Sequence, residues 1–568
     1  MRWKILPPEP GAETLVGALG CHPVVAQILW NRGLRDPAAA ESFLAARLRD
    51  LPDPSSLAGI EAAVHRLARA LVEDEPITVH GDYDVDGVSA TALLVSFLRA
   101  CGARRVDYVV PHRLRDGYGL AAETVRRLAA QGTRLLVTLD CGVTAVTEID
   151  EAVALGLDVI VVDHHQAPAD LPRAVAILNP WQPGCRYPTR ELAAVGVTFL
   201  LCVALRRFLR GRGWFERRRE PDLREWLEFV ALGTIADVVP LVGANRLLVR
   251  AGLRRLSEAT RPGIRALKRV AGMEPEAEVS AGQVAFRLAP RINAVGRLDD
   301  AGIAVELLLA EDAARAENLA RRLDAANAER QSIERELLKE AAAQAERQSG
   351  RAVVVAGEGW HPGVIGIVAA RLVERFRRPA IVIGLDLETG VGRGSGRSIG
   401  DFDLYEALER CASLLEGYGG HKQAAGLTIA RAAVPAFAEA FSRVAEESFD
   451  PAAAEPVCVV ESVLRPADID EPLCEAIAAL GPFGAGNPEP VLALLGTAVR
   501  GRVVGANGNN GGHLKLQLDD APLVDAIGFG MGHRLADLSR HVDLAFTLAI
   551  DTYGGLRRPQ LRLRAIRT

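Results

Sequence analysis

The architecture of this chain is clearest at residues 79–94, VHGDYDVDGVSATALL. An apolar run ends in His80, and three aspartates follow at alternate positions, Asp82, Asp84 and Asp86, before a helix-like segment begins. Carboxylates this close repel one another, so such a cluster persists only where water solvates it or its members share a cation. The stretch therefore predicts a strand that ends at a cation site, with a solvated acidic turn as the alternative.

The segment DYDVDG, residues 82–87, also matches the first six positions of a calcium-binding EF-hand loop, including the glycine. The twelfth position of that loop requires a bidentate glutamate, and Leu93 stands there. The segment before the aspartates is strand-like, whereas an EF-hand begins with a helix. The sequence therefore argues against a calcium loop of this type.

Short β-branched runs alternate with helix-like segments in this part of the chain. The runs cover residues 77–79, 106–110, 135–139 and 159–162, and the helix-like segments cover 89–100, 121–130 and 147–155. This alternation is typical of βαβ units, in which helices cover both faces of a parallel sheet.

Polar residues follow the other strand-like runs as well. Asp140 follows the third run, Asp163, His164 and His165 follow the fourth, and Asp237 lies in the segment GTIADVVPL, which we group with the strand ends. Singly, such aspartates are ordinary caps or turn residues. Residues just past the carboxyl ends of parallel strands converge on one crevice, however. Many carboxylates with few imidazoles favour manganese or magnesium over zinc.

Composition and charge limit the class of protein. Hydrophobic residues make up 49% and charged residues 24%, which is ordinary globular usage. The apolar runs are shorter than the roughly 20 residues that span a bilayer, so we expect a cytoplasmic protein without a membrane segment. The eight cysteines include no CxxC pair, which argues against a zinc finger and fits free thiols in a reducing compartment. A net charge of −5 gives no overall electrostatic argument for a nucleic-acid partner.

Four motifs, HGDYDVDG, TLDCG, DHHQ and IADVVPL, resemble the sequential motifs of the DHH phosphoesterase superfamily. Its members include family II pyrophosphatases, small oligonucleotide phosphatases and the RecJ exonucleases. Residues 359–384, 392–408 and 417–429 resemble the DHH-associated domain. FRLAPRINAVGRLDD (286–300) and GPFGAGNPEP (481–490) are similar to stretches of the RecJ exonucleases in particular.

The resemblance and the patterns together predict an α/β multidomain protein of about three or four units, given 568 residues. We expect an N-terminal helical segment of the catalytic core at 1–75, a parallel-sheet DHH domain at 76–300, a connecting helix at 301–350, a second α/β, DHH-associated domain at 351–450, and a C-terminal β-barrel of the OB type at 455–568. Short strands separated by turn signals predict the barrel.

The resemblance implies two bound divalent cations, Mn²⁺ or Mg²⁺. The implied ligands are Asp82, Asp84, Asp86, Asp140, His164 and Asp237. Asp140 is implied as the bridge between the ions, and His80 is either a ligand or a partner of one. His165 is implied, with Asp140, as a catalytic residue that contacts the scissile phosphate or a leaving oxygen, and the alternative for His165 is a hydrogen-bonded core histidine. Two ions about 3.5 to 4 Å apart can activate water and stabilise both oxygens of an in-line displacement.

The resemblance also implies substrate-binding residues in four further segments. They are Arg113, Tyr118, Arg291, Asn293, Arg297, Ser395, Arg397 and His421. Arg113, Ser395 and Arg397 are expected to hold a 5′-terminal phosphate through charge-assisted hydrogen bonds. The alternative is that these arginines pair with surface carboxylates.

The implied function is 5′-to-3′ exonucleolytic hydrolysis of single-stranded DNA to 5′-mononucleotides, in DNA recombination and repair. A small-molecule or oligonucleotide phosphatase or pyrophosphatase and a catalytically inactive scaffold are the alternatives. The barrel and the long helix favour a polymeric substrate. The resemblance implies a monomer that works with a single-stranded-DNA-binding protein and a helicase.

Overall fold

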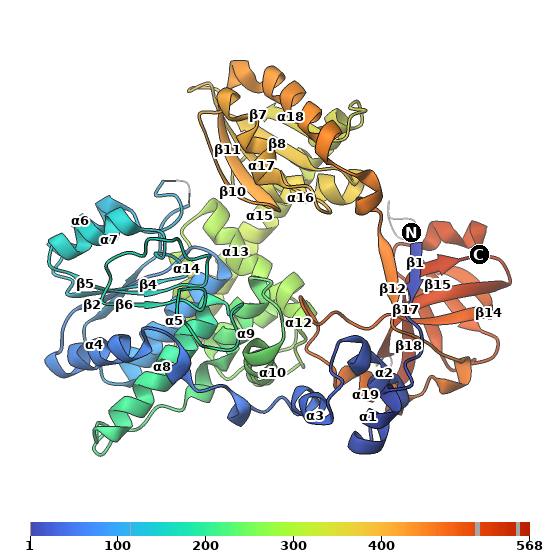
Figure 1. The fold of residues 1–568 in the computed structure, drawn as a ribbon, viewed down its shortest axis with the longest axis horizontal. Coiled ribbons are helices and arrows are strands. Elements are labelled where there is room, and N and C mark those ends of the chain that lie inside the picture. The colour runs from blue at the N-terminus through green and yellow to red at the C-terminus, as the bar shows by residue number, and fades with distance from the viewer. Residues whose placement is uncertain (1, 114, 506–511, 552–556) are drawn as a thin grey trace.

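The computed structural model describes residues 2–113, 115–505, 512–551 and 557–568. It contains a parallel-sheet domain, a second α/β domain and a barrel. The long helix α15 (Ala313–Ala345) leads from the first domain to the second, and the strand β12 (Val457–Val460) leads into the barrel (Figure 1). Among the described residues, no helix combines the length and apolar character needed to cross a membrane.

The first domain is built on a five-stranded sheet in the order β3-β2-β4-β5-β6, and every neighbouring pair is parallel. Its strands are β2 (Ile77–His80), β3 (Val106–Val109), β4 (Leu135–Leu139), β5 (Asp158–Val162) and β6 (Ala176–Leu178). Its first helices are α4 (Ile60–Glu73), α5 (Val85–Ala100), α6 (Ala122–Ala130) and α7 (Val146–Ala154). The strand order reverses between β2 and β4, and ligands of such sheets bind at this reversal.

Further helices complete this domain and lead out of it. They are α8 (Ala194–Gly211), α9 (Leu227–Ala236), α10 (Gly243–Glu258), α11 (Pro262–Val270), α12 (Ala281–Gln283), α13 (Ala289–Leu298), α14 (Gly302–Leu309) and α15 (Ala313–Ala345). The single helix expected over 301–350 is thus two helices. Asp312 breaks it, because its side chain caps α15 by accepting a hydrogen bond from the amide of Arg315.

The second domain has a mixed sheet in the order β10-β11-β9-β8-β7. Its elements are β7 (Val353–Glu358), α16 (Ile365–Phe376), β8 (Ala380–Leu385), β9 (Val391–Arg397), α17 (Leu404–Glu409), β10 (Gly417–His421), β11 (Ala424–Ala430) and α18 (Val434–Ser448). In this sheet β7 and β8 are parallel neighbours, whereas the pairings β8–β9, β9–β11 and β10–β11 are antiparallel.

The C-terminal strands form a closed barrel, because the order β14-β15-β16-β18-β17 returns to β14 through a β14–β17 pairing. The elements are β12 (Val457–Val460), β13 (Ser462–Val463), α19 (Glu471–Ala478), β14 (Leu492–Val504), β15 (His513–Leu518), β16 (Asp525–Gly528), β17 (His541–Asp551) and β18 (Arg558–Arg567). The expected fold class, α/β domains followed by an OB-type barrel, is confirmed.

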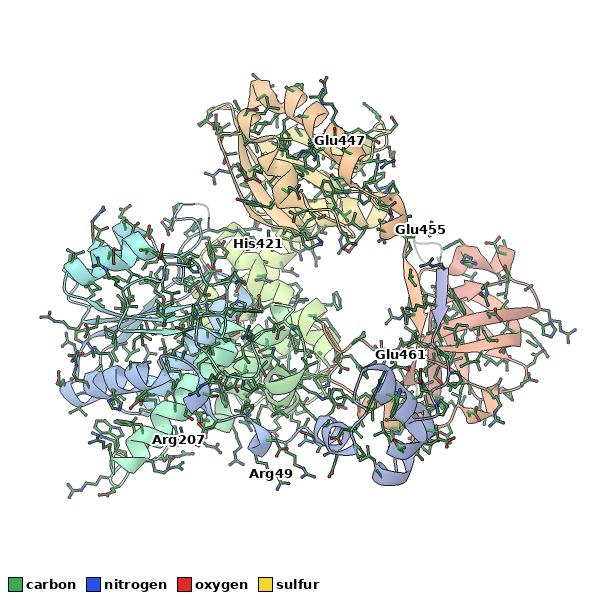
Figure 2. The ribbon with its side chains drawn as sticks, viewed as in Figure 1. Arg49, Arg207, His421, Glu447, Glu455 and Glu461 are labelled. Carbon is green, nitrogen blue, oxygen red and sulfur yellow. The ribbon has the colours of Figure 1, made fainter. Side chains whose placement is uncertain are left out.

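The N-terminal segment differs from the expectation that residues 1–75 belong to the catalytic core. Its elements are β1 (Arg2–Ile5), α1 (Ala12–Leu19), α2 (Pro23–Asn31) and α3 (Pro37–Ala45). β1 pairs with β12, and the three helices share one hydrophobic core with the barrel, whereas the segment from Leu57 packs in the first domain. Arg32 and Glu461 form an ion pair of 2.7 Å at this junction, where Figure 2 labels Glu461.

Candidate active site

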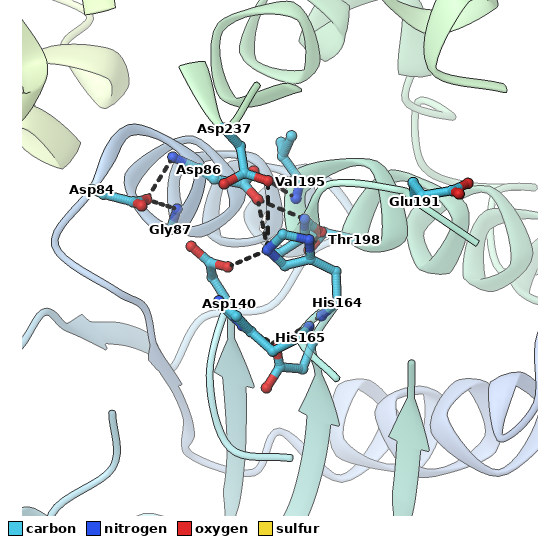
Figure 3. A network of polar contacts seen from close by, with 12 residues as sticks. Asp84, Asp86, Gly87, Asp140, His164, His165, Glu191, Val195, Thr198 and Asp237 are labelled. Atoms are coloured by element: carbon cyan, nitrogen blue, oxygen red, sulfur yellow. Dashed lines mark hydrogen bonds and ion pairs between the residues drawn. The ribbon is translucent and has the colours of Figure 1, made fainter. Parts of the chain in front are cut away.

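The aspartate-rich loop after β2 is held by hydrogen bonds to two helix starts. Asp84 caps α5 by accepting from the amides of Asp86 (2.9 Å) and Gly87 (3.1 Å). The two carboxylate oxygens of Asp86 accept from the amides of Ala194 (2.6 Å) and Val195 (2.9 Å) at the start of α8. Both side chains are therefore fixed by backbone amides before any ligand binds (Figure 3).

Asp140 follows β4 in the left-handed region, with φ of +63°. Aspartate tolerates this conformation better than most residues. Its amide donates to the carbonyl of Val162, so the turn is attached to β5. The Asp140 side chain is buried and lies at the strand-order reversal.

Asp163 organises the turn that carries the two histidines. Its carboxylate accepts hydrogen bonds from the amides of Val143, His164 and His165 and lies 2.8 Å from Nδ1 of His165. The hydroxyl of Tyr118 lies 3.2 Å from the same Nδ1 and donates to the carbonyl of Asp140 at 3.0 Å. Nδ1 of His165 is thereby engaged, which leaves its Nε2 for a ligand.

Ligand atoms of these loops converge, with Nε2 of His164 3.1 Å from Oδ1 of Asp140 and 3.6 Å from Oδ2 of Asp237 (Figure 3). Among the described residues, three overlapping groups have ligand atoms within 4.8 Å of one another: Asp140, His164 and His165; Asp86, His164 and Asp237; Asp82, Asp84 and Asp140. Asp140 belongs to two of these groups, as a bridging ligand would.

Three buried atoms of the cluster, Oδ1 of Asp82, Oδ1 of Asp140 and Nε2 of His164, make no well-directed hydrogen bond in the part of the chain that is described, although the last two lie 3.1 Å apart. Burial, with a contribution from Asp84, raises the pKa of Asp82 to about 8 and that of Asp237 to about 7. Burial and neighbouring carboxylates also raise the pKa of Asp140. Unpaired buried carboxylates are costly, and divalent cations remove this cost, so the residues present fit such ions.

The histidines have opposite electrostatic environments. Burial, with the charge of His165, lowers the pKa of His164 to about 4, so its imidazole is neutral and suited to bind a metal. Burial also lowers the pKa of His165, but the hydrogen bond and charge of Asp163 outweigh this effect and raise it overall.

Asp237 and His80 differ from the other predicted ligands in their surroundings. Asp237 does not end a strand, because GTIA is the last turn of α9. This helix is buried on all sides and is mostly apolar after Glu228, so its sequence resembles that of a core strand. His80 is buried, with Nδ1 3.6 Å from the sulfur of Cys141. It belongs to none of the three groups, although its Nε2 has no partner among the described atoms.

A group of arginines lies beside the aspartate loop. Arg113 stacks over the ring of Tyr83 at 4.7 Å, and Arg297 donates to the carbonyl of Gly363 at 2.8 Å. Burial, together with the charges of Arg113, Arg330 and Arg397, lowers the pKa of Arg297 to about 10. Like charges gathered in this way favour an anionic ligand.

Ser395 and Arg397 join this group at the start of α16. The Arg397 guanidinium lies 3.2 Å from the Ser395 hydroxyl. A Cβ on Gly366 would lie 2.9 Å from that hydroxyl and 3.2 Å from the guanidinium, so glycine is required for the close approach. Helix N-termini favour anions. Gly366 and Tyr83 were not predicted from the sequence. The glycine spacing in HPGVIG was a signal for Gly366.

The remaining predicted substrate-binding residues are Asn293, Arg291 and His421, and each has a different environment. Asn293 accepts a hydrogen bond from the amide of Val85 and so supports the aspartate loop. The guanidinium of Arg291 is engaged by Asp324 and by backbone carbonyls, away from the cluster. His421 is exposed at the end of β10, in the register row that contains Ala424 and Arg397. Figure 2 labels His421 where the second domain approaches the first.

A parallel sheet with this carboxylate and histidine cluster at its strand-order reversal, followed by a second α/β domain, defines the DHH class of proteins. The family model "DHH family, N-terminal domain" matches residues 76–234, "DHHA1 domain" matches 349–447 and "RecJ OB domain" matches 460–565.

Curated relatives carry the name single-stranded-DNA-specific exonuclease RecJ. The Dickeya dadantii protein is 40% identical over 94% of this chain and 93% of its own length, and the Escherichia coli protein is 38% identical over 95% of each. The crystal structure of Thermus thermophilus RecJ in complex with Mn²⁺ covers this whole chain and is matched over 79% of its length, with a TM-score of 0.85 and 34% identity. A second structure of that protein contains Mg²⁺. This chain belongs to the RecJ family.

Proposed function

We propose that this chain is a single-stranded-DNA-specific exonuclease that hydrolyses phosphodiester bonds from the 5′ end and releases 5′-mononucleotides with two Mn²⁺ or Mg²⁺ ions. One observation carries the proposal: a carboxylate and histidine cluster built for cations lies directly beside an arginine group built for an anion. Arg113 joins the two, because it stacks on Tyr83 between Asp82 and Asp84.

The chain's own residues account for binding and orientation. Asp82, Asp84, Asp86, Asp140, His164 and Asp237 hold the ions, which when bound lower the pKa of a shared water and stabilise the attacking and leaving oxygens. His165 is oriented by Asp163 and Tyr118, so that Nε2 can contact the scissile phosphate or the leaving oxygen. Backbone amides keep the Asp86 carboxylate in position throughout.

Direction follows from anchoring of the 5′-terminal phosphate. Arg113, Ser395 and Arg397, with Arg297 and the start of α16, form the anchor, and the first phosphodiester would then reach the residues that would hold the ions. The positive charges of Arg113, Arg330 and Arg397 surround Arg297, and this concentration of charge supports the assignment.

Two cavities support a polymeric substrate over a small phosphoester. The first, about 660 Å³, runs from Val238 beside Asp237 past Phe286 to Phe483, and the side chain of Phe286 is 84% exposed. The second, about 670 Å³, lies between α10 and the barrel. Exposed aromatic and arginine side chains suit stacked bases and phosphates.

The test uses single strands labelled at the 5′ or the 3′ end, with each metal in turn. Mononucleotides should appear from the 5′ label first. Arg397→Ala should raise KM for 5′-phosphorylated strands about 10- to 100-fold, because a charge-assisted hydrogen bond contributes about 1.5 to 3 kcal/mol.

The same substitution should abolish the advantage of 5′-phosphorylated over 5′-hydroxyl strands. Arg397→Lys, which keeps the charge without the planar fork, should fall between wild type and alanine. Release of nucleotides from the 3′ end, or an unchanged preference in Arg397→Ala, contradicts the anchor.

The proposal extends to the surroundings of the enzyme. All eight cysteines are free, which supports a reducing, cytoplasmic compartment. A single-stranded-DNA-binding protein and a helicase would supply the substrate in recombination and repair, and the enzyme itself would act as a monomer. Size measurement by light scattering and pull-down with each partner test these points.

A further inference from the structure

The loop 481–490, GPFGAGNPEP, which we call the docking loop, contacts the chain just after the metal-site residue Asp237. The amide of Leu241 donates to the carbonyl of Ala485 at 2.8 Å. A Cβ on Gly486 would lie 2.8 Å from the Cβ of Pro240, and glycine is needed there for this approach. The docking loop therefore fixes the backbone three and four residues beyond Asp237.

The backbone between these points is strained. Val238 has φ of +62°, a conformation that is a genuine outlier for a β-branched residue. Its side chain is 70% exposed, so burial does not hold it there. Such strain persists only where flanking structure imposes it. The buried helix α9 holds one flank, and the docking loop holds the other at Pro240 and Leu241.

The docking loop is itself fixed by contacts from three directions. Asn487 is 1% exposed and donates to the carbonyls of Leu480 and Pro482. Arg32 at the end of α2 donates to Asn487, and Arg246 from α10 donates to the carbonyl of Leu480 at 2.8 Å. The position of the docking loop thus depends on how the barrel unit sits on the first domain.

The docking loop also separates the two cavities. Phe483 and Gly484 line both of them, and Val238 lines the first. A strand long enough to enter both cavities must touch the docking loop, whereas a very short one held at the cluster does not. This step rests on the proposed function, because it takes the cavities as the path of the strand.

We propose that residues 484–486 of the docking loop are positioning residues for the metal site. They hold Asp237 within reach of the cations, and they couple strand occupancy of the cavities to cation affinity. Coupling of this kind is reciprocal: a long strand tightens binding of the cation, and the cation tightens binding of the strand by the same factor.

The first test measures Mn²⁺ affinity of the full chain without DNA. Gly486→Ala should weaken Mn²⁺ binding about 10- to 100-fold, the range for residues that orient metal ligands. Gly496→Ala is the matched control: Gly496 has φ of +60°, lies in the same barrel unit and has no atom within 4 Å of an added Cβ. It should leave Mn²⁺ affinity unchanged.

A second variant separates the contact from general damage. Gly486→Ala combined with Pro240→Gly removes the nearest atom that the new Cβ meets, although the backbone Cα of residue 240 stays 3.2 Å away, and should restore part of the Mn²⁺ affinity. Wild-type affinity in folded Gly486→Ala, or an equal loss in Gly496→Ala, overturns the positioning role. A lack of rescue in the double variant also overturns it.

A measurement on the unmodified chain covers the case in which Gly486→Ala does not fold. Mn²⁺ affinity is compared in the presence of 3- and 20-nucleotide strands that carry the same phosphorothioate at the first linkage. Both strands place a phosphate at the ions, so both should raise it, and the longer strand should raise it more. Equal effects of the two strands overturn the coupling. If the wild type does not cleave ordinary strands, this result instead contradicts the proposed function.

Discussion

Asp140 combines three properties that rarely occur together in one side chain. It adopts a left-handed backbone conformation, it is buried, and one carboxylate oxygen accepts no well-directed hydrogen bond from the described residues. A purely structural role explains none of these costs, since a glycine would satisfy the turn and an apolar residue would satisfy the burial. A carboxylate at this place fits the proposed cation site, because Asp140 belongs to two of the groups whose ligand atoms converge.

The first prediction concerns this residue. Asp140→Ala should lower turnover of single-stranded DNA at least about 1,000-fold, because it removes several kcal/mol of charge stabilisation at the ions. The fold should remain, as judged by circular dichroism and the thermal midpoint, while bound Mn²⁺ falls. Asp170→Asn, at an exposed position, is the control and should behave as wild type. Normal turnover in a folded Asp140→Ala enzyme would rule out the two-metal assignment.

The helix α9 illustrates how far the sequence could be interpreted at the scale of an element. The aspartate loop and the turns after β4 and β5 were predictable, because parallel strands bring their carboxyl ends together. The segment before Asp237 was assigned to the wrong element, since a helix with no polar face lacks the periodicity that distinguishes it from a buried strand. The motif IADVVPL nevertheless indicated that Asp237 lies near the other predicted ligands, as it does in the structure.

The second prediction concerns the buried end of α9. Glu228 is fully buried, and although Nε of Arg261 is 2.7 Å away, neither carboxylate oxygen has a well-directed hydrogen bond in the described structure. Burial raises the pKa of Glu228 to about 7. Since the native state holds this proton more tightly, its contribution to stability is complete below about pH 4.5 and is lost as the pH rises through about 7.

Glu228→Gln should therefore flatten the fall in unfolding free energy between pH 5 and pH 8, by up to about 3 kcal/mol. Urea denaturation at both pH values measures it. Glu225→Gln is the control, because the half-exposed side chain of Glu225 is nearby and pairs with Arg219 at the surface. If both variants keep the wild-type pH profile, the raised pKa is not the cause.

The third prediction concerns the edge strand β7, which is covered by Gln344 in the last turn of α15 and by Gln348 just beyond that helix. Gln344 pairs through its amide with both backbone groups of Ala356, and Gln348 does the same with Val354. Each glutamine thus takes the place of a residue on a neighbouring strand and protects an open edge.

Gln344→Leu combined with Gln348→Leu should destabilise the second domain by about 2 to 6 kcal/mol, because strand groups are left unpaired. It should also increase aggregation on heating. Arg347→Leu, an exposed position on the same turn, should have little effect. Unchanged denaturation curves for the double variant would mean that water replaces the glutamines without loss.

The whole molecule depends on contacts that no local pattern could predict. The helices of residues 12–45 look like part of the first domain in sequence, yet they share the core of the barrel. Arg246 of α10 is 2% exposed and donates to carbonyls of Phe43 and Leu480, so it joins the first domain to both ends of the chain. Contacts between residues far apart in sequence determine this arrangement. Hydrophobic periodicity is a local pattern and does not predict such contacts.

This arrangement places arginines of two units around one cavity, and the last prediction follows from it. Arg562 of β18 lies on the second cavity with Arg250 and Arg254 of α10. If the strand leaves the ions through the two cavities, Arg562→Ala should weaken binding of a 30-nucleotide strand and reduce the slope of log K against log salt by about 0.7, the value for one phosphate contact. Cleavage of a 4-nucleotide strand should be unaffected, because it ends before the barrel.

Arg558→Ala, at an exposed position elsewhere on β18, controls for general charge loss. An equal effect of Arg562→Ala on both lengths would mean that the path of the DNA does not cross this cavity.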